Sequence, residues 1–188
     1  MTLRMLHFSD LQQQATHVQL LAFSAAYLDL AAALCERLCS TPSDTNYAHG
    51  AVVMSMAFHS LELFFKAGIV KLQPQERFAG RSGHDMDTLA KRFFRLYPKK
   101  EFQFEVPFGH EVLEVVGGIA GDELAVLRAF VEERKRQVPE DQRHRYPIDV
   151  EGQPWQHANF GFEPNSFLGT LRELQNVYAH LQPLLRAG

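Results

Sequence analysis

The chain has 188 residues, of which 46% are apolar and 22% charged, values typical of one soluble domain large enough to bury its own core. The net charge of -3 excludes a general attraction to nucleic-acid phosphates. No uninterrupted apolar run approaches the roughly 18 residues of a membrane span, and the N-terminus lacks a signal-peptide pattern. We therefore expect a single domain over residues 1–188, in the cytoplasm and away from membranes.

The two cysteines, Cys35 and Cys39, lie four residues apart, a spacing that places both thiols on one face of a helix. A zinc or iron-sulfur site would need further ligands, and the chain has no second cysteine pair. Buried thiols that act as small apolar groups are the simpler interpretation. We expect no metal and no cofactor.

A first long helix is predicted from Ser9 to Ser40, because apolar residues recur there at steps of three and four. Ser9 is its expected N-cap, with Gln12 three residues on. A second apolar row widens its buried face and indicates contact with more than one neighbour. This second row consists of Leu20, Tyr27, Leu30, Leu34 and Leu38.

A second helix is predicted to begin near Asp44 or Thr45 and to run to about Leu72. Apolar residues surround most of its circumference, so several helices must cover it. The gap in this apolar coat is a polar stripe within an arc of roughly 60°. The stripe consists of Ser55, His59, Glu62 and Lys66.

The third predicted helix covers "HDMDTLAKRFFRLYP", residues 84–98, with Pro98 as its terminator. Residues 101–106 then alternate apolar and polar side chains, and residues 145–156 carry a turn signal, so both are predicted as short strands or ordered loops. Residues 121–136 between them read as another helix.

The last predicted helix covers residues 163–188, and Pro183 should bend or end it because proline lacks a backbone donor. Its predicted inward residues are Phe167, Leu171, Leu174, Tyr178, Leu181 and Leu185. The pattern as a whole predicts an all-α fold, an antiparallel up-and-down bundle of four or five helices. A small irregular or β-hairpin insertion is expected at about residues 99–163.

The apolar helix with "HSLELFFKA", followed by a turn and "GHDMDTLAKRF", resembles the HEPN family of helical domains (higher eukaryotes and prokaryotes nucleotide-binding). The residues that carry the resemblance are Glu62, Lys66, His84 and Asp85, and it covers residues 47–98 best. It implies an up-and-down α-bundle that is often dimeric and occurs in toxin-antitoxin and phage-defence systems. Some members of the family are metal-independent endoribonucleases.

Catalytic members of that family carry an Arg, then four to six residues, then a His on a late helix. The nearest match here is Arg172 with His180, which are separated by seven residues. This spacing offsets the two side chains by about 80° around an ideal helix and roughly 12 Å along it. In such a pair, His moves a proton at the ribose or the leaving oxygen while Arg stabilises phosphate charge.

The stripe of His59, Glu62 and Lys66 has three interpretations. It is a solvated helix face, a groove in which Lys66 binds an anionic group, or a buried polar network that sets helix register. Arg172, Asn176 and His180 likewise follow one polar side of the last helix, where solvent alone would satisfy them.

One dense basic region, residues 134–145, is nearly cancelled by interleaved acids and is best read as a surface loop. If RNA binds, Arg143, Arg145 and Tyr146 would supply phosphate contacts and a stacking surface. Glycine-rich phosphate loops, a di-iron Glu-x-x-His pattern and a DNA-binding motif are all missing from the sequence.

Two functions follow from these observations. The first is a non-catalytic HEPN-like binding domain that acts as a homodimer or with an RNA or protein partner. The second is a metal-independent ribonuclease of a defence or toxin system that uses His180 with Arg172, or with an arginine from elsewhere.

Overall fold

A computed structural model describes residues 9–44, 46–80, 83–107, 153 and 162–187. All regular structure within these residues is helical, so the all-α prediction is confirmed there. The helices are α1 (Ser9–Gln12), α2 (Thr16–Ser40), α3 (Tyr47–Leu72), α4 (Met86–Leu96) and α7 (Pro164–Arg186). The described residues also include two 3-10 turns, η1 (Pro42–Asp44) and η3 (Lys100–Phe102).

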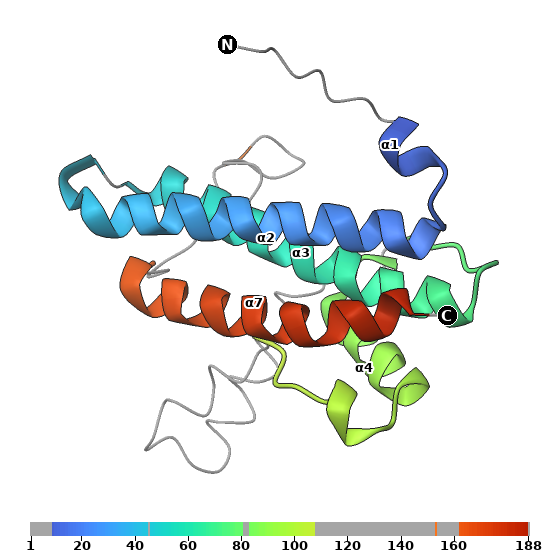
Figure 1. Ribbon diagram of the computed structural model, residues 1–188. Coiled ribbons are helices and arrows are strands. Elements are labelled where there is room, and N and C mark those ends of the chain that lie inside the picture. The colour runs from blue at the N-terminus through green and yellow to red at the C-terminus, as the bar shows by residue number, and fades with distance from the viewer. Residues whose placement is uncertain (1–8, 45, 81–82, 108–152, 154–161, 188) are drawn as a thin grey trace.

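The long helices α2, α3 and α7 lie side by side, and α4 packs against α3 (Figure 1). Helix α2 runs in the direction opposite to α3 and α7, as the colour gradient along each ribbon of Figure 1 shows. Ser24 meets Ser60 of α3, and Cys35 meets Pro164 of α7. The fold thus places α3 among α2, α4 and α7.

Helix α3 begins at a capping pair. The Asn46 side chain accepts a hydrogen bond from the backbone N–H of His49, and the His49 ring accepts one from the N–H of Asn46. The predicted start near Asp44 or Thr45 is therefore two to three residues early, whereas the predicted end at Leu72 is confirmed. Fourteen of the 26 residues of α3 are buried, as its apolar coat predicts.

Two glycines allow neighbouring aromatic rings to approach α3 closely. A Cβ at Gly68 would lie 2.6 Å from Cδ2 of Phe93, and a Cβ at Gly50 would lie 2.7 Å from the Phe162 ring. Tyr97 reinforces the first contact, because its hydroxyl donates to the Gly68 carbonyl at 2.8 Å. Helix α4 is therefore fitted against a part of α3 that has no side chain.

The core is rich in aromatic side chains. Phe64 of α3 stacks on Tyr178 of α7 with ring centroids 4.4 Å apart, and Phe65 stacks on Phe104 at 5.9 Å. Phe93 of α4 packs against both phenylalanines of α3. These contacts tie α3, α4, α7 and the segment after η3 into one apolar cluster.

The structure corrects the predicted helix from Ser9 to Ser40. Ser9 lies inside the short helix α1 rather than capping a long one, and the chain leaves helical geometry before α2 starts at Thr16. Ala15 has φ -57° and ψ 145°, and Gln12 to Ala15 are all exposed. This stretch has no large apolar side chain to bury, so packing does not hold it in the helix.

Pro183 was expected to bend or to end the last helix, and the second expectation is wrong. It lies within α7, which continues to Arg186, so it does not end the helix. The last turn is held because Leu185 is buried and because Lys71 of α3 donates to the carbonyls of Leu184 and Ala187. The buried positions predicted for this helix are confirmed, except that Phe167 is only partly buried.

Of the two strand-or-loop segments, residues 101–106 contain the end of η3 and then continue without regular structure, so the loop alternative holds. Residues 121–136 and nearly all of 145–156 lie outside the described residues.

Helices α2 and α3 are long and apolar enough to cross a membrane by length and composition, but 72% of the most apolar window of α3 is buried in the protein, against 33% for α2.

Candidate functional site

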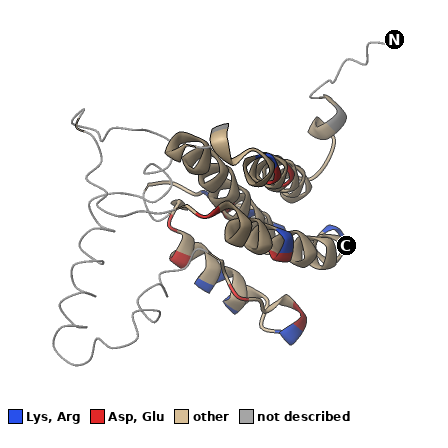
Figure 2. Ribbon diagram, turned by 90° about the vertical axis from the view of Figure 1, so that its left-hand side faces the viewer, with Lys and Arg blue, Asp and Glu red and all other residues tan. Residues whose placement is uncertain are grey.

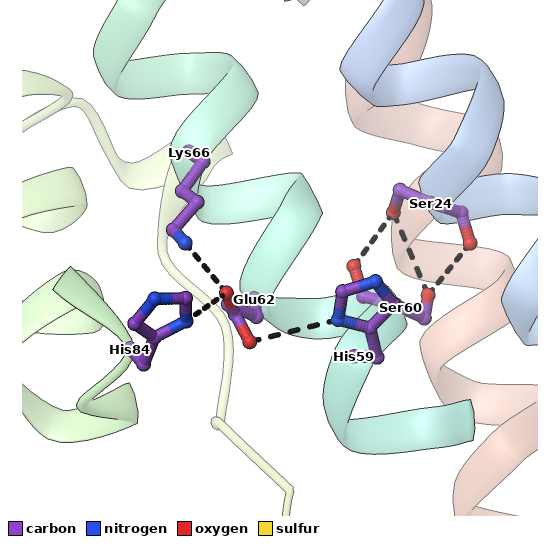
Figure 3. Close-up of polar contacts among 6 residues, drawn as sticks. All are labelled: Ser24, His59, Ser60, Glu62, Lys66 and His84. Carbon is purple, nitrogen blue, oxygen red and sulfur yellow. Dashed lines mark hydrogen bonds and ion pairs between the residues drawn. The ribbon is translucent and has the colours of Figure 1, made fainter. Parts of the chain in front are cut away.

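The polar stripe of α3 converges on one carboxylate. The Glu62 side chain is 4% exposed and contacts three side chains, as Figure 3 shows. Lys66 donates to its Oε1 at 2.5 Å, Nδ1 of His84 lies 2.9 Å from the same oxygen, and Nδ1 of His59 lies 3.6 Å from Oε2. We call these four residues, His59, Glu62, Lys66 and His84, the Glu62 cluster.

The chain folds this way locally because of the segment between α3 and α4. Gly80 has a positive φ of 69°, and the N–H of Gly83 donates to its carbonyl at 3.2 Å, which turns the chain back toward α3. The Phe78 ring then covers Lys66, whose Nζ lies 5.0 Å from the ring centroid. His84 follows, directly before the N-cap of α4.

Asp85 provides that N-cap. Its side chain accepts a hydrogen bond from the N–H of Thr88 at 2.8 Å, as its acidic character at the helix start predicts. The four residues that carry the family resemblance are therefore contiguous in the structure. Glu62 contacts Lys66 and His84, and Asp85 begins the helix that follows.

The electrostatics of Glu62 favour the charged form. Burial alone raises the pKa of this carboxyl, but its interactions with His59, Lys66 and His84 outweigh burial and lower the pKa to about 2. Glu62 is thus an ionised carboxylate at neutral pH, saturated by its partners.

Burial decides among the interpretations of the stripe. The solvated-face interpretation is wrong for Glu62 and Lys66, which are 3% and 7% exposed. The two form a buried ion pair, while His84 is half exposed at the edge of the cluster. His59 is partly buried and packs edge-on against Tyr27 of α2, with ring centroids 4.7 Å apart. The arrangement fits a polar network that holds α3 against the start of α4 and against α2.

The predicted catalytic pair lies elsewhere. Arg172 and His180 are both exposed on α7, and the Arg172 guanidinium donates to Glu36 of α2 at 3.0 Å. Asn176, between them, is also exposed. Arg172 therefore lies at the junction of α7 with α2, whereas the partners of Glu62 lie on α3 and before α4. Arg143, Arg145 and Tyr146 lie outside the described residues.

A second polar group, which the sequence interpretation did not identify, joins three helices. Ser24 Oγ of α2 donates to the Ser60 carbonyl at 2.8 Å, and Ser60 Oγ donates to the Ser24 carbonyl at 2.7 Å. The Tyr178 hydroxyl of α7 lies 3.0 Å from Ser60 Oγ. Both serines and the tyrosine are buried. The small side chains of the two serines gave no periodic signal that distinguishes them from spacers in an apolar face, whereas Tyr178 was predicted as an inward residue of its helix.

The positions of the two cysteines fit the interpretation of buried thiols that act as small apolar groups. Cys35 is buried and donates to the Pro164 carbonyl at 3.2 Å, and burial raises its pKa to about 12, which keeps it protonated. Cys39 is partly buried. In the part of the chain that the structure describes, no His, Cys, Asp and Glu side chains gather in a group of three or more suited to a metal ion.

Comparisons with known proteins give no relative. No protein-family model, curated protein or solved structure matches the chain. The functional conclusion therefore depends on the geometry of the chain itself.

Proposed function

We propose that this protein is a divergent HEPN-like helical domain that acts in the cytoplasm by binding, as a homodimer or with an RNA or protein partner, and not by cleaving RNA. Its fold is then an antiparallel up-and-down bundle with an insertion at about residues 99–163. The antiparallel contacts of α2 with α3 and α7, and the contiguity of Glu62, Lys66, His84 and Asp85, support this assignment.

The observation that carries the proposal is the state of Arg172. A ribonuclease of this type needs its arginine free to stabilise phosphate charge and close to its histidine. Here the guanidinium is paired with Glu36 at 3.0 Å, and His180 lies eight positions further along an exposed helix face. The buried Glu62 cluster does not replace the pair, because its carboxylate and lysine neutralise each other.

The test is an RNA cleavage assay in EDTA with structured and single-stranded RNA. The wild-type chain and the His180→Ala variant are compared, since the exposed His180 can be replaced without loss of packing. We expect no cleavage, or a trace that the substitution leaves unchanged. Cleavage by the wild type that His180→Ala abolishes would contradict the proposal and establish the ribonuclease alternative.

A gel-shift titration with the same RNAs at low salt measures binding directly. Retention that weakens as salt rises would identify RNA as the partner, because displaced counterions favour dissociation at high salt. A strict monomer that shifts no RNA would remove the homodimer and the RNA partner, the two main supports of the binding proposal.

A further inference from the structure

A basic surface lies on α4 and on the turn that follows it. Residues 86–100 contain five basic residues and one acid, although the whole chain has a net charge of -3. Figure 2 shows Lys and Arg segments in blue along α4, the lowest of the coloured helices. Four of the five basic side chains are exposed, and no hydrogen bond or ion pair joins them to another described residue; they are Lys91, Arg95, Lys99 and Lys100. We call these four residues the α4 basic surface.

The packing of α4 turns this surface toward solvent. Leu89, Ala90 and Phe93 are buried, and α4 packs against α3. On an ideal helix, Lys91 and Arg95 lie on the side opposite to these three residues, about 6 Å apart along the axis. Because the apolar side of α4 is used in the core, its basic side stays outside.

The two lysines beyond the helix belong to a turn with many hydrogen bonds. The Tyr97 hydroxyl donates to a backbone carbonyl of α3 at 2.8 Å, and the Gln103 side chain donates to the Tyr97 carbonyl at 2.8 Å. The N–H of Phe102 donates to the Lys99 carbonyl at 3.0 Å. The backbone that carries Lys99 and Lys100 is therefore fixed at the end of α4, and a fixed surface loses less entropy when it binds.

Basic side chains elsewhere in the described part of the chain are mostly engaged in contacts within the protein. Lys66, Arg92 and Arg172 form ion pairs with acids. Lys71 donates to the Leu184 carbonyl of α7. Among the described residues, the local excess of positive charge therefore lies on the α4 basic surface.

A structural role explains one of these four charges. A cation near the C-terminal end of a helix is stabilised by the helix dipole, and Arg95 lies in the last turn of α4. Lys91 lies in the middle of the helix, and Lys99 and Lys100 lie beyond its end. The other three charges have no such role in the helix.

The chemistry of the surface favours a nucleic-acid backbone as its partner. Unpaired Lys and Arg side chains neutralise phosphates and release their counterions. A protein partner fits less well, because three of the four residues are Lys, which is depleted in protein–protein interfaces. A membrane surface takes up apolar side chains beside the charges, whereas the apolar side of α4 is buried in the core.

We propose that the α4 basic surface binds the phosphate backbone of a nucleic acid. This inference rests on the proposed binding function, in which RNA is one partner, and it assigns that partner a surface on a different helix from Arg172 and His180. Phosphate contacts carry no base information, so the binding depends strongly on salt and not on sequence.

The test is a fluorescence-anisotropy titration with two labelled probes, oligouridine and oligothymidine of about 20 nucleotides, between about 50 and 200 mM salt. We expect the wild type to bind both probes with similar affinity, because their phosphate backbones are alike. Neutralisation of four phosphates on a single strand predicts that affinity falls about 50-fold over this salt range.

The variant Lys91→Ala with Arg95→Ala removes two of the four charges. We expect its affinity at low salt to be at least about tenfold weaker and its salt dependence about half as steep. Arg37→Glu is the matched control, because it changes an exposed residue of α2 and lowers the net charge by the same amount. It should bind as the wild type does. Lys99→Ala with Lys100→Ala gives a second reading outside the helix, and circular dichroism confirms that each protein is folded.

A variant of Lys91 and Arg95 that binds as tightly as the wild type would overturn this surface while leaving the binding function in place. A wild type that binds neither probe, or only one of them, would also overturn the proposal. Sedimentation of the wild type with phosphatidylglycerol vesicles and not with the probes would overturn it as well, because lipid would then be the partner. His180-dependent RNA cleavage would contradict the proposed function and not this surface, so the two failures are distinguishable.

Discussion

At the residue scale, Glu62 is the side chain whose surroundings depart most from the expectation of its type. An acid four residues before a lysine is normally a surface pair of small energetic value. Here the pair is buried, and removal of one member leaves the other charge without compensation.

The substitution Glu62→Gln is therefore expected to lower the free energy of unfolding by about 3 kcal/mol at pH 7. Glu36→Gln, which removes the exposed partner of Arg172, is the matched control and should cost less than about 1 kcal/mol. Urea unfolding monitored by circular dichroism measures both. Equal losses in the two variants would show that burial of the Glu62 pair has no energetic consequence.

The same carboxylate predicts a pH dependence. Its pKa is about 2 in the folded protein and near 4.5 when unfolded, so the unfolded chain binds the proton more readily. The stabilisation is complete above pH 4.5 and is lost as the pH falls toward 2. The difference in unfolding free energy between wild type and Glu62→Gln should shrink across this window. A difference that stays constant from pH 6 to pH 2.5 would contradict the assignment.

Gly68 provides a packing prediction. A methyl group there would collide with Phe93, so Gly68→Ala should destabilise the protein by about 1 to 3 kcal/mol. Gly169 is the matched control, because it is also helical but a methyl group there would meet no neighbouring atom within 4 Å, and Gly169→Ala should stabilise by up to about 1 kcal/mol. In thermal unfolding, we expect the midpoint temperature of Gly68→Ala to lie below that of the wild type and the midpoint of Gly169→Ala to lie above it. A stabilised Gly68→Ala protein would show that α4 does not pack closely on α3.

At the element scale, the buried hydroxyls of Ser24, Ser60 and Tyr178 join α2, α3 and α7. Replacing Ser60 by Ala removes a hydroxyl that lies 3.0 Å from the Tyr178 hydroxyl and leaves this buried hydroxyl with one partner fewer, which costs about 1 to 3 kcal/mol. Ser40→Ala, at an exposed serine near the end of α2, should change stability by less than about 0.5 kcal/mol. Denaturant unfolding of the two variants measures both changes in stability. A Ser60→Ala protein as stable as the wild type would show that the Ser24, Ser60 and Tyr178 contacts do not stabilise the fold.

The helices were predictable where the apolar residues of a single segment follow a clear helical pattern. The apolar coat of α3 and the inward row of α7 determine both helices and their buried faces. The break at residues 13–15 was not predictable from periodicity, because the apolar steps resume in register after it. Pro183 stays in its helix because Lys71 and the burial of Leu185 support the last turn, and both contacts are tertiary.

The candidate site was only partly predictable for the same reason. The positions of Glu62 and Lys66 on one helix face follow from their spacing, but the burial of this pair depends on Phe78 and His84, which reach it from another segment. The spacing of Arg172 and His180 indicated a poor catalytic pair. The contact of Arg172 with Glu36, 136 residues away in sequence, shows which group holds it.

At the scale of the whole molecule, the described residues combine buried polar contacts, such as those of Glu62 with Lys66 and of Ser24 with Ser60, with an apolar face on α2 and α3 where Phe23, Leu30 and Val52 are more than 40% exposed. Such a face is common where proteins associate and uncommon on an isolated monomer. The arrangement supports the proposal that this protein works through contact with a partner.

The mass of the wild-type chain in solution tests this view most directly. Sedimentation equilibrium over a range of protein concentrations, with and without RNA, should give a species of twice the 21.4 kDa chain mass. A particle of 21.4 kDa at every concentration, unchanged when RNA is added, would contradict both the homodimer and the RNA partner proposed for this protein.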